Sequence, residues 1–300
     1  RSPYYPDNKI VRDDIARVYS NITVMDREVG ELIAQLKEDG LMDSTIIVFY
    51  SDHGGPLSRQ KRSVFDAGLK VPLIVRYPDK RFAGTKNDAL VSFVDFPATW
   101  LSVADIPVPD YMQGQAFLGN QKTKDREYIY AARDRMDGQY DMVRAVRDKK
   151  YKYIRNYKPE QPVYQDIEFR KNGVNTMKEL IRLRDLGQLN ETQMIWFRPT
   201  KPLEELYDCE ADPHEINNLA ANPEYRDILK ELGKAHLAWM DDIGDLGQLS
   251  EKEMVWRMWP GGVQQETTVP VISYENNMIT ISSQTKGASI GFKINAKDPN

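Results

Sequence analysis

The feature that most constrains this chain is an uncharged run of β-branched and aromatic residues, Thr45–Tyr50, with the letters TIIVFY. Such a run predicts a strand buried on both faces, as in the parallel sheet of an α/β protein. The run ends at Ser51, and Asp52, His53 and two glycines follow at once. Because ligands of open α/β sheets bind beyond the carboxyl ends of the strands, we expect a site at this turn.

The turn offers one hard ligand and one imidazole. Asp52 supplies the carboxylate oxygen that Ca²⁺ or Mg²⁺ prefers. Imidazole prefers transition metals, so His53 is either an unusual metal ligand or a donor to a bound anion. The alternative without a ligand is a strand-end turn in which Asp52 caps a helix, since D-H-G alone is a weak signal. Arg59 and Lys61 follow shortly and bring positive charge to the same segment.

Length and charge exclude several classes of protein. The 300 residues have room for one large or two ordinary domains with a sizeable core. There are 45 acidic and 41 basic residues, for a net charge of −4, which is not the profile of a nucleic-acid-binding protein. No apolar run approaches the roughly 20 residues that a membrane helix needs. The one cysteine, Cys209, excludes an internal disulfide framework.

The periodicity of the chain predicts further elements. Apolar residues spaced by three and four between Val11 and Leu36 predict a helix of about seven turns, with Gly40 placed to end it. A second apolar strand is expected at Val71–Tyr77. Asp95 is a candidate N-cap for a helix over Phe96–Ala104.

The second half of the chain predicts an antiparallel sheet. Short strands are expected at 128–132, 142–147 and 151–157, the last two joined as a hairpin. Four cations lie on the last two of these strands, Arg144, Arg147, Lys152 and Arg155. They are expected either to form a solvated face or to contact an anionic substrate. A helix is expected from Pro223 to about Met240. After a linker at 254–262, three short strands are expected at 268–274, 278–283 and 288–294.

Several of these stretches resemble, in the same order, the C-terminal half of the type I sulfatases of the alkaline phosphatase superfamily. The matching runs are SDHGG with KRSVFDAGLKVP, VSFVDFPATWLSVADIPVP, RAVRDKKYKYI, and LYD with DPHEINNL. Within that family, the segment DHGGPLSRQKR resembles most the branch that contains heparan N-sulfatase (sulfamidase). The tail run ITISSQTKGASIGFKI resembles a β-sandwich module found in some bacterial hexosaminidases and sulfatases.

The resemblance implies an α/β fold, the C-terminal part of a sulfatase-like sandwich with a mainly parallel sheet. We expect the catalytic α/β part over 1–120, a subdomain with an antiparallel sheet and a helix over 121–250, and a linker with a partial β module over 251–300.

The resemblance also implies a hydrolase of sulfuric esters or sulfamates on sulfated sugars derived from glycosaminoglycans. It implies Ca²⁺, or Mg²⁺ in its place, at Asp52 and His53. Lys61 would be catalytic and would bind the sulfate group together with His53 and Arg59. Asp66 would orient the loop. The family's location is periplasmic or secreted.

The family's nucleophile is a formylglycine made within a C/S-x-P/A-x-R motif, and this chain has no such motif around Cys209 or any serine. We therefore expect the nucleophile in a missing N-terminal half, which would be a partner of this chain, and we expect this chain alone to be inactive. Two alternatives stay open. One is a phosphatase or phosphodiesterase with two transition metals, although only three histidines occur. The other is a non-catalytic carbohydrate-binding relative.

Overall fold

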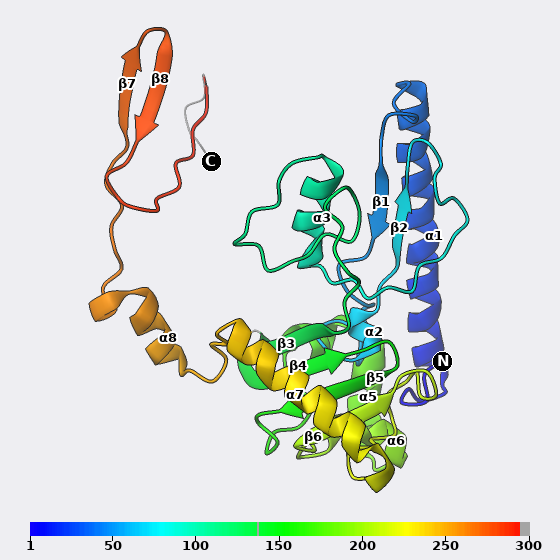
Figure 1. The fold of residues 1–300 in the computed structure, drawn as a ribbon. Coiled ribbons are helices and arrows are strands. Elements are labelled where there is room, and N and C mark those ends of the chain that lie inside the picture. The colour runs from blue at the N-terminus through cyan, green and yellow to red at the C-terminus, as the bar shows by residue number, and fades with distance from the viewer. Residues whose placement is uncertain (137, 295–300) are drawn as a thin grey trace. The chain divides into compact units, whose positions relative to one another are not determined.

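The computed structural model describes residues 1–136 and 138–294 (Figure 1). The chain forms two compact units, Arg1–Asp245 and Leu246–Asn300. The first unit therefore holds the predicted segment 1–120 and nearly all of the predicted segment 121–250. It also contains every residue that the sequence points to as a site.

The chain opens with a long helix, α1 (Lys9–Glu38), whose prediction is confirmed. The Asn8 side chain caps its first turn by accepting a hydrogen bond from the Val11 amide at 3.1 Å. Gly40 follows the helix with a φ of +68°, the left-handed conformation in which glycine ends helices without strain. The carboxylate of Asp14, buried on α1, accepts hydrogen bonds from the Thr176 amide and hydroxyl at 2.6 and 2.8 Å. This contact fixes α1 to the start of α5 (Asn175–Asp185).

Two short strands follow, β1 (Ile47–Tyr50) and β2 (Leu73–Arg76), with the short helix α2 (Asp66–Leu69) between them. The two strands pair antiparallel, with Tyr50 opposite Leu73. The predicted parallel pairing is therefore not found, and the ladders among the described strands are all antiparallel. The reason is that an apolar run indicates burial of a strand but carries no information on the direction of its neighbour.

Asp95 differs in detail from its predicted role. It is the first residue of α3 (Asp95–Val103) and not the cap, and its side chain is almost completely buried. One carboxylate oxygen accepts from the Ser92 amide at 3.1 Å, and Arg126 binds the carboxylate with its guanidinium, the Nε at 2.7 Å. Asp95 thus ties α3 to the loop that leads into the second sheet.

The second sheet has four strands in the order β3-β4-β5-β6, all antiparallel. Its strands are β3 (Ile129–Met136), β4 (Gln139–Arg147), β5 (Tyr151–Asn156) and β6 (Glu204–Asp208). The predicted hairpin between β4 and β5 is confirmed, and Asp148 closes it by accepting from the amides of Lys150 and Tyr151.

Alternation along these strands sends side chains to two separate cores. One face packs against α7 (Arg226–Asp242), which crosses the sheet in Figure 1, and its buried residues are Val146, Tyr153, Leu206 and Leu232. The other face packs against α5, against η1 (Ile195–Phe197) and against the segment that precedes α2. Its buried residues include Phe65, Val143, Ile154, Met177, Trp196 and Tyr207. The sheet is thus the body against which the segment before α2 is held.

The short elements beside the sheet are α4 (Glu168–Gly173), α6 (Glu191–Met194) and η2 (Pro223–Tyr225). The second unit comprises α8 (Glu251–Met258), η3 (Pro260–Gly262) and a hairpin of β7 (Val271–Glu275) and β8 (Met278–Ser282). The third strand predicted at 288–294 does not form. Of the helices described, none has both the length and the apolar character to cross a membrane.

His236 gives the first unit a specific dependence of stability on pH. It is buried on α7, where the Tyr157 hydroxyl lies 2.8 Å from its Nε2. Burial, together with the nearby charges of Arg155 and Arg144, lowers the pKa of His236 to about 4. In the unfolded chain the imidazole titrates near its ordinary pKa of about 6.5. The unfolded state therefore gains a proton first as pH falls, and stability that is complete above pH ~6.5 is lost towards pH ~4.

We expect the free energy of unfolding to fall by about 2 kcal/mol between pH 7 and pH 5 because of His236 alone. Urea unfolding at the two pH values measures the total loss, to which other groups contribute. His236→Gln, which cannot titrate, isolates the histidine by difference. An equal loss in wild type and variant would show that His236 does not carry this dependence.

Candidate active site

The predicted ligands at the end of β1 lie side by side. The Nδ1 of His53 lies 2.7 Å from the Gly54 carbonyl oxygen, so this nitrogen donates its proton there. The Nε2 lies 3.2 Å from a carboxylate oxygen of Asp52. In the neutral imidazole, Nε2 is then an acceptor, and two acceptors face each other. Such a pair is stabilised by a proton or a metal cation shared between its two members. The Asp52 side chain is 80% exposed, so its carboxylate is accessible to an ion.

The turn that carries these ligands packs closely against α2 and is held by hydrogen bonds. The Ser51 hydroxyl donates to the His53 carbonyl at 2.7 Å, and the Gly54 amide donates to the Gly68 carbonyl at 3.0 Å. A side chain at Gly54 would place its Cβ 1.9 Å from the Ala67 carbonyl oxygen, so only glycine fits there. The turn after β1 is thereby fixed to the end of α2.

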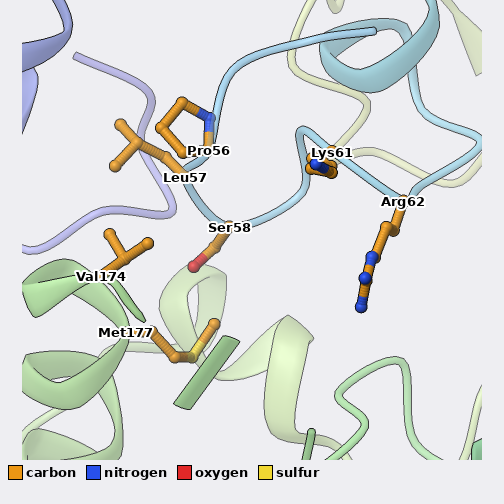
Figure 2. Close-up of a pocket in the computed structure, with 7 residues that line it drawn as sticks. All are labelled: Pro56, Leu57, Ser58, Lys61, Arg62, Val174 and Met177. Atoms are coloured by element: carbon orange, nitrogen blue, oxygen red, sulfur yellow. The ribbon is translucent and has the colours of Figure 1, made fainter. Parts of the chain in front are cut away.

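Lys61 is on the same segment, and its backbone lies beside this turn. The Lys61 amide donates to the Gly55 carbonyl at 2.9 Å. The Lys61 side chain lines a hollow of about 10 Å³, room for about one water molecule (Figure 2). The other residues that line it are Pro56, Leu57, Ser58, Arg62, Val174 and Met177. The structure thus brings Asp52, His53 and Lys61 onto one continuous, hydrogen-bonded segment.

The predicted substrate contact of Arg59 is not what the structure shows. Arg59 is 3% exposed, and its guanidinium donates to the Glu215 carbonyl at 2.8 Å. It also lies over the Phe65 ring, 3.7 Å from the ring centre. The guanidinium therefore points into the protein. The sequence did not predict the burial of Arg59. An arginine close to a lysine can either bind an anion at the surface or bind backbone carbonyls in the interior, and the sequence does not distinguish the two.

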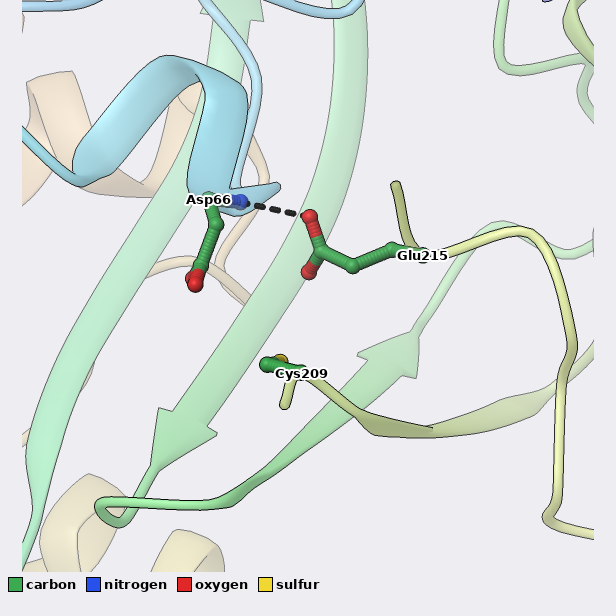
Figure 3. Close-up of side chains that lie close together, drawn as sticks. All are labelled: Asp66, Cys209 and Glu215. Carbon is green, nitrogen blue, oxygen red and sulfur yellow. Dashed lines mark hydrogen bonds between the residues drawn. The ribbon is translucent and has the colours of Figure 1, made fainter. Parts of the chain in front are cut away.

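A buried ionic cluster lies behind the segment. Asp66, Cys209 and Glu215 bring their ligand atoms within 4.8 Å of one another, and Figure 3 shows the three side chains converging. The Lys152 ammonium sits among them, 2.5 Å from Asp66 and 2.7 Å from Glu215. Arg147 adds two contacts to the Asp66 carboxylate, each of 3.2 Å. The cations of this cluster are therefore two side chains of the protein, Lys152 and Arg147.

The electrostatics of the cluster agree with that assignment. Burial raises the pKa of the Cys209 thiol to about 12, so sulfur stays protonated and is neither a nucleophile nor a good metal ligand. Burial also raises the pKa of Glu215. For Asp66, burial works in the same direction, but Lys152 and Arg147 outweigh it and lower the pKa. The predicted role of Asp66 in orienting the loop is consistent with these contacts.

The prediction of a solvated cationic face on β4 and β5 is wrong for most of its members. Lys152 is 1% exposed, and Arg144 is buried between Asp245 and Asp134 at 2.6 and 2.9 Å. Arg155 alone of the four keeps an appreciable exposed part, and it pairs with Glu204 at 3.2 Å. Alternation in a hairpin predicts which residues share a face, but not whether a helix or a loop covers that face.

Comparison with known proteins identifies two family models in the chain. The model described as sulfatase matches residues 2–106. The model described as N-sulphoglucosamine sulphohydrolase, C-terminal, matches residues 58–182. The two models overlap over the segment of Lys61 and Asp66. Their order along the chain is that of the predicted resemblance.

Relatives cover nearly the whole chain. An ulvan-active sulfatase of Formosa agariphila is 51% identical over 293 residues, which are 97% of this chain and 49% of the relative. Human N-sulphoglucosamine sulphohydrolase is 25% identical over 89% of this chain and 54% of its own length. The chain thus spans about half the length of the curated relatives that it matches.

A solved structure has the same fold. It is a protein in complex with its substrate D-glucosamine-2-N,6-O-disulfate, with a TM-score of 0.56 and 24% identity, over 76% of this chain and 41% of that chain. The predicted α/β class, with its sulfatase-like architecture and small antiparallel sheet, is confirmed by this likeness. Together the two family models, the relatives and the fold support one conclusion: the chain belongs to the sulfatase family.

Proposed function

We propose that the full-length protein hydrolyses sulfate esters on sugars of a sulfated polysaccharide. The observation that carries this proposal is the 51% identity, over 97% of the chain, to the ulvan-active sulfatase. The likeness to human N-sulphoglucosamine sulphohydrolase is weaker, at 25% identity, and supports a sulfamate substrate less well. Glycosaminoglycan-derived sugars remain the second substrate class to test. We propose a sulfated carbohydrate as the partner of the site and a periplasmic or secreted location, which the likeness to a bacterial sulfatase supports.

We assign Asp52 and His53 to a Ca²⁺ site. The exposed carboxylate of Asp52 and the facing Nε2 of His53, 3.2 Å apart, fit a shared cation. Calcium takes six to eight ligands, nearly always oxygens, so these two residues form part of a site that other groups complete. Such a cation would neutralise negative charge on the bound sulfate group and on its attacker. Metal analysis of the purified protein decides whether Ca²⁺ or Mg²⁺ binds at this site.

Lys61 is the catalytic group that we assign within this chain. Negative charge grows on the oxygens when a sulfate ester S–O bond breaks, and a fixed ammonium stabilises that charge. The hydrogen bond between Lys61 and Gly55 holds its backbone beside the metal turn. His53, where it does not bind the metal, would donate from Nε2 to the sulfate group as an imidazolium with both ring nitrogens protonated.

The nucleophile is assigned to the remaining length of the full-length protein. No C/S-x-P/A-x-R motif occurs in this chain, and the relatives are about twice as long. The first unit has an apolar surface that a further part of the protein could cover. Ile22, Met25 and Leu32 share one face of α1 by their helical spacing and are 49%, 38% and 68% exposed. Exposed apolar residues that gather in this way mark interaction surfaces. We propose that the part with the formylglycine packs there.

Sulfate release from defined substrates tests the proposal. The full-length protein is incubated with sulfated ulvan oligosaccharides, with glucosamine 2-N- and 6-O-sulfates, and with a phosphate monoester, and the released ions are separated by ion chromatography. We expect sulfate from at least one sulfated sugar and bound Ca²⁺ in the active protein. Release of phosphate alone, with two zinc ions bound, would favour the phosphatase alternative. Binding of sugars without release of either ion would favour a non-catalytic relative.

A further inference from the structure

The buried ionic cluster behind the active-site segment has a geometry that a general stabilising role does not require. Lys152 and Glu215 are each 1% exposed, and the Lys152 ammonium lies between the carboxylates of Glu215 and Asp66. Replacing such buried ion pairs by apolar residues is often neutral or stabilising, so burial of these charges points to a need for defined geometry.

Glu215 holds the active-site segment at two separate points. Its carboxylate accepts a hydrogen bond from the Asp66 amide at 2.6 Å, which fixes the start of α2 (Figure 3). Its carbonyl accepts from the Arg59 guanidinium at 2.8 Å. Arg59 has a backbone φ of +64°, in the left-handed region that residues other than glycine rarely adopt, and this contact helps to hold it there.

Lys61 lies between the two fixed points, Arg59 and Asp66. The same residue of the 209–222 loop thus determines the path of the chain on both sides of the assigned catalytic lysine. Lys152 on β5 sets the position of the Glu215 carboxylate, and Arg147 on β4 sets that of Asp66. The chain of contacts runs from the four-stranded sheet through these charges to Lys61.

We propose that Glu215 and Lys152 are positioning residues for catalysis, which hold Lys61 where the sulfate charge develops. The proposal rests on the function assigned to Lys61 above. It gives the four-stranded sheet a role in the reaction, as the rigid body that places the lysine. We call the contacts of Glu215 with Asp66 and Arg59, together with its ion pair to Lys152, the clamp. Displacement of a catalytic group by about 1 Å can cost about 100-fold in rate, so loss of the clamp should have a measurable effect on kcat.

Glu215→Gln tests the clamp with little change of shape. It removes the charge opposite Lys152 and leaves one carboxylate, Asp66, to neutralise two cations. We expect kcat for sulfate release to fall at least about tenfold, with a smaller change in KM, because Lys61 matters most in the transition state. Arg147→Gln leaves both Lys152 contacts in place and should give a smaller loss of kcat.

A matched control exists in the same sheet. Asp141 on β4 is a completely buried carboxylate that pairs with the buried Lys201 at 2.7 Å and with Arg133. Asp141→Asn disturbs an ion cluster of the same kind that makes no contact with the 52–66 segment among those described. We expect it to lower stability like Glu215→Gln while kcat stays within about twofold of wild type. Equal losses of kcat in both variants would overturn the proposal.

A double-mutant cycle with Lys61→Ala decides whether Glu215 acts through the lysine. If it does, Glu215→Gln should lower kcat by no more than about twofold in a protein that already lacks the lysine side chain. Fully multiplicative losses would show that Glu215 works by another route.

Amide hydrogen exchange provides a readout that needs no catalysis. Glu215→Gln should speed exchange at the Lys61 and Asp66 amides, and Asp141→Asn should not. If wild type releases no sulfate from any substrate, the proposed function fails, and the clamp is judged by these amides alone. Unchanged exchange there would refute it.

Discussion

The full-length protein carrying Asp52→Ala is expected to lose its bound Ca²⁺ and about 1,000-fold or more of its sulfatase kcat. The carboxylate is the hard oxygen ligand that we propose at the end of β1, and His53 alone offers a nitrogen that calcium binds poorly. A metal that stabilises transition-state charge is worth several kcal/mol, and each ~1.4 kcal/mol is tenfold in rate. Metal content is measured by atomic emission after gel filtration, and turnover by sulfate release.

The fold should survive this substitution. The Asp52 side chain is 80% exposed and follows β1, so its removal opens no cavity, and stability should change by less than about 0.5 kcal/mol. Asp43→Ala is the matched control, because Asp43 is an exposed carboxylate before the same strand, 89% accessible and 3.8 Å from Arg76. We expect this control to keep both metal and turnover. A protein with Asp52→Ala that binds Ca²⁺ as wild type does would remove Asp52 from the metal site.

The sequence allowed the local elements to be predicted where a single pattern determines them. The spacing of apolar residues gave α1, and Gly40 marked its end, because helix periodicity and a left-handed terminal residue are local properties. The hairpin of β4 and β5 followed from its alternation and its short connection. The direction of pairing between β1 and β2 was not predicted, since it depends on which segment lies alongside.

The candidate site was predictable to the extent that it lies on one segment. Asp52, His53 and Lys61 lie within ten residues of one another in the chain, so the sequence alone is enough to propose them together. The ionic cluster joins residues far apart in sequence, Asp66 with Lys152 and Glu215. A lysine on a strand gives no local sign that two distant carboxylates meet it, and burial of Lys152 became evident only from the packed sheet. Arg59 was misassigned for the same reason, as its acceptor is a distant backbone carbonyl.

Lys61→Ala should separate charge stabilisation from metal binding. We expect metal content near that of wild type and a fall in kcat of about 100- to 1,000-fold, the usual cost of removing one group that stabilises a developing anion. KM should rise less than kcat falls, because the ammonium interacts more strongly with the transition state than with the bound ester. Steady-state kinetics on a sulfated sugar, together with metal analysis of the same sample, measure both quantities.

The control for charge alone is Lys86→Ala, at an exposed lysine in the loop after β2, which should leave both kinetic constants unchanged. A rise in KM with kcat preserved would mean that Lys61 binds ground state and transition state equally and is a binding residue only. Loss of metal in Lys61→Ala, with metal retained in Asp52→Ala, would reverse the two assignments. Since Lys61 and Asp52 lie on one segment fixed by the Gly54–Gly68 and Lys61–Gly55 hydrogen bonds, neither substitution removes the contacts that position the other residue. The two variants therefore report on two separate functions of the segment.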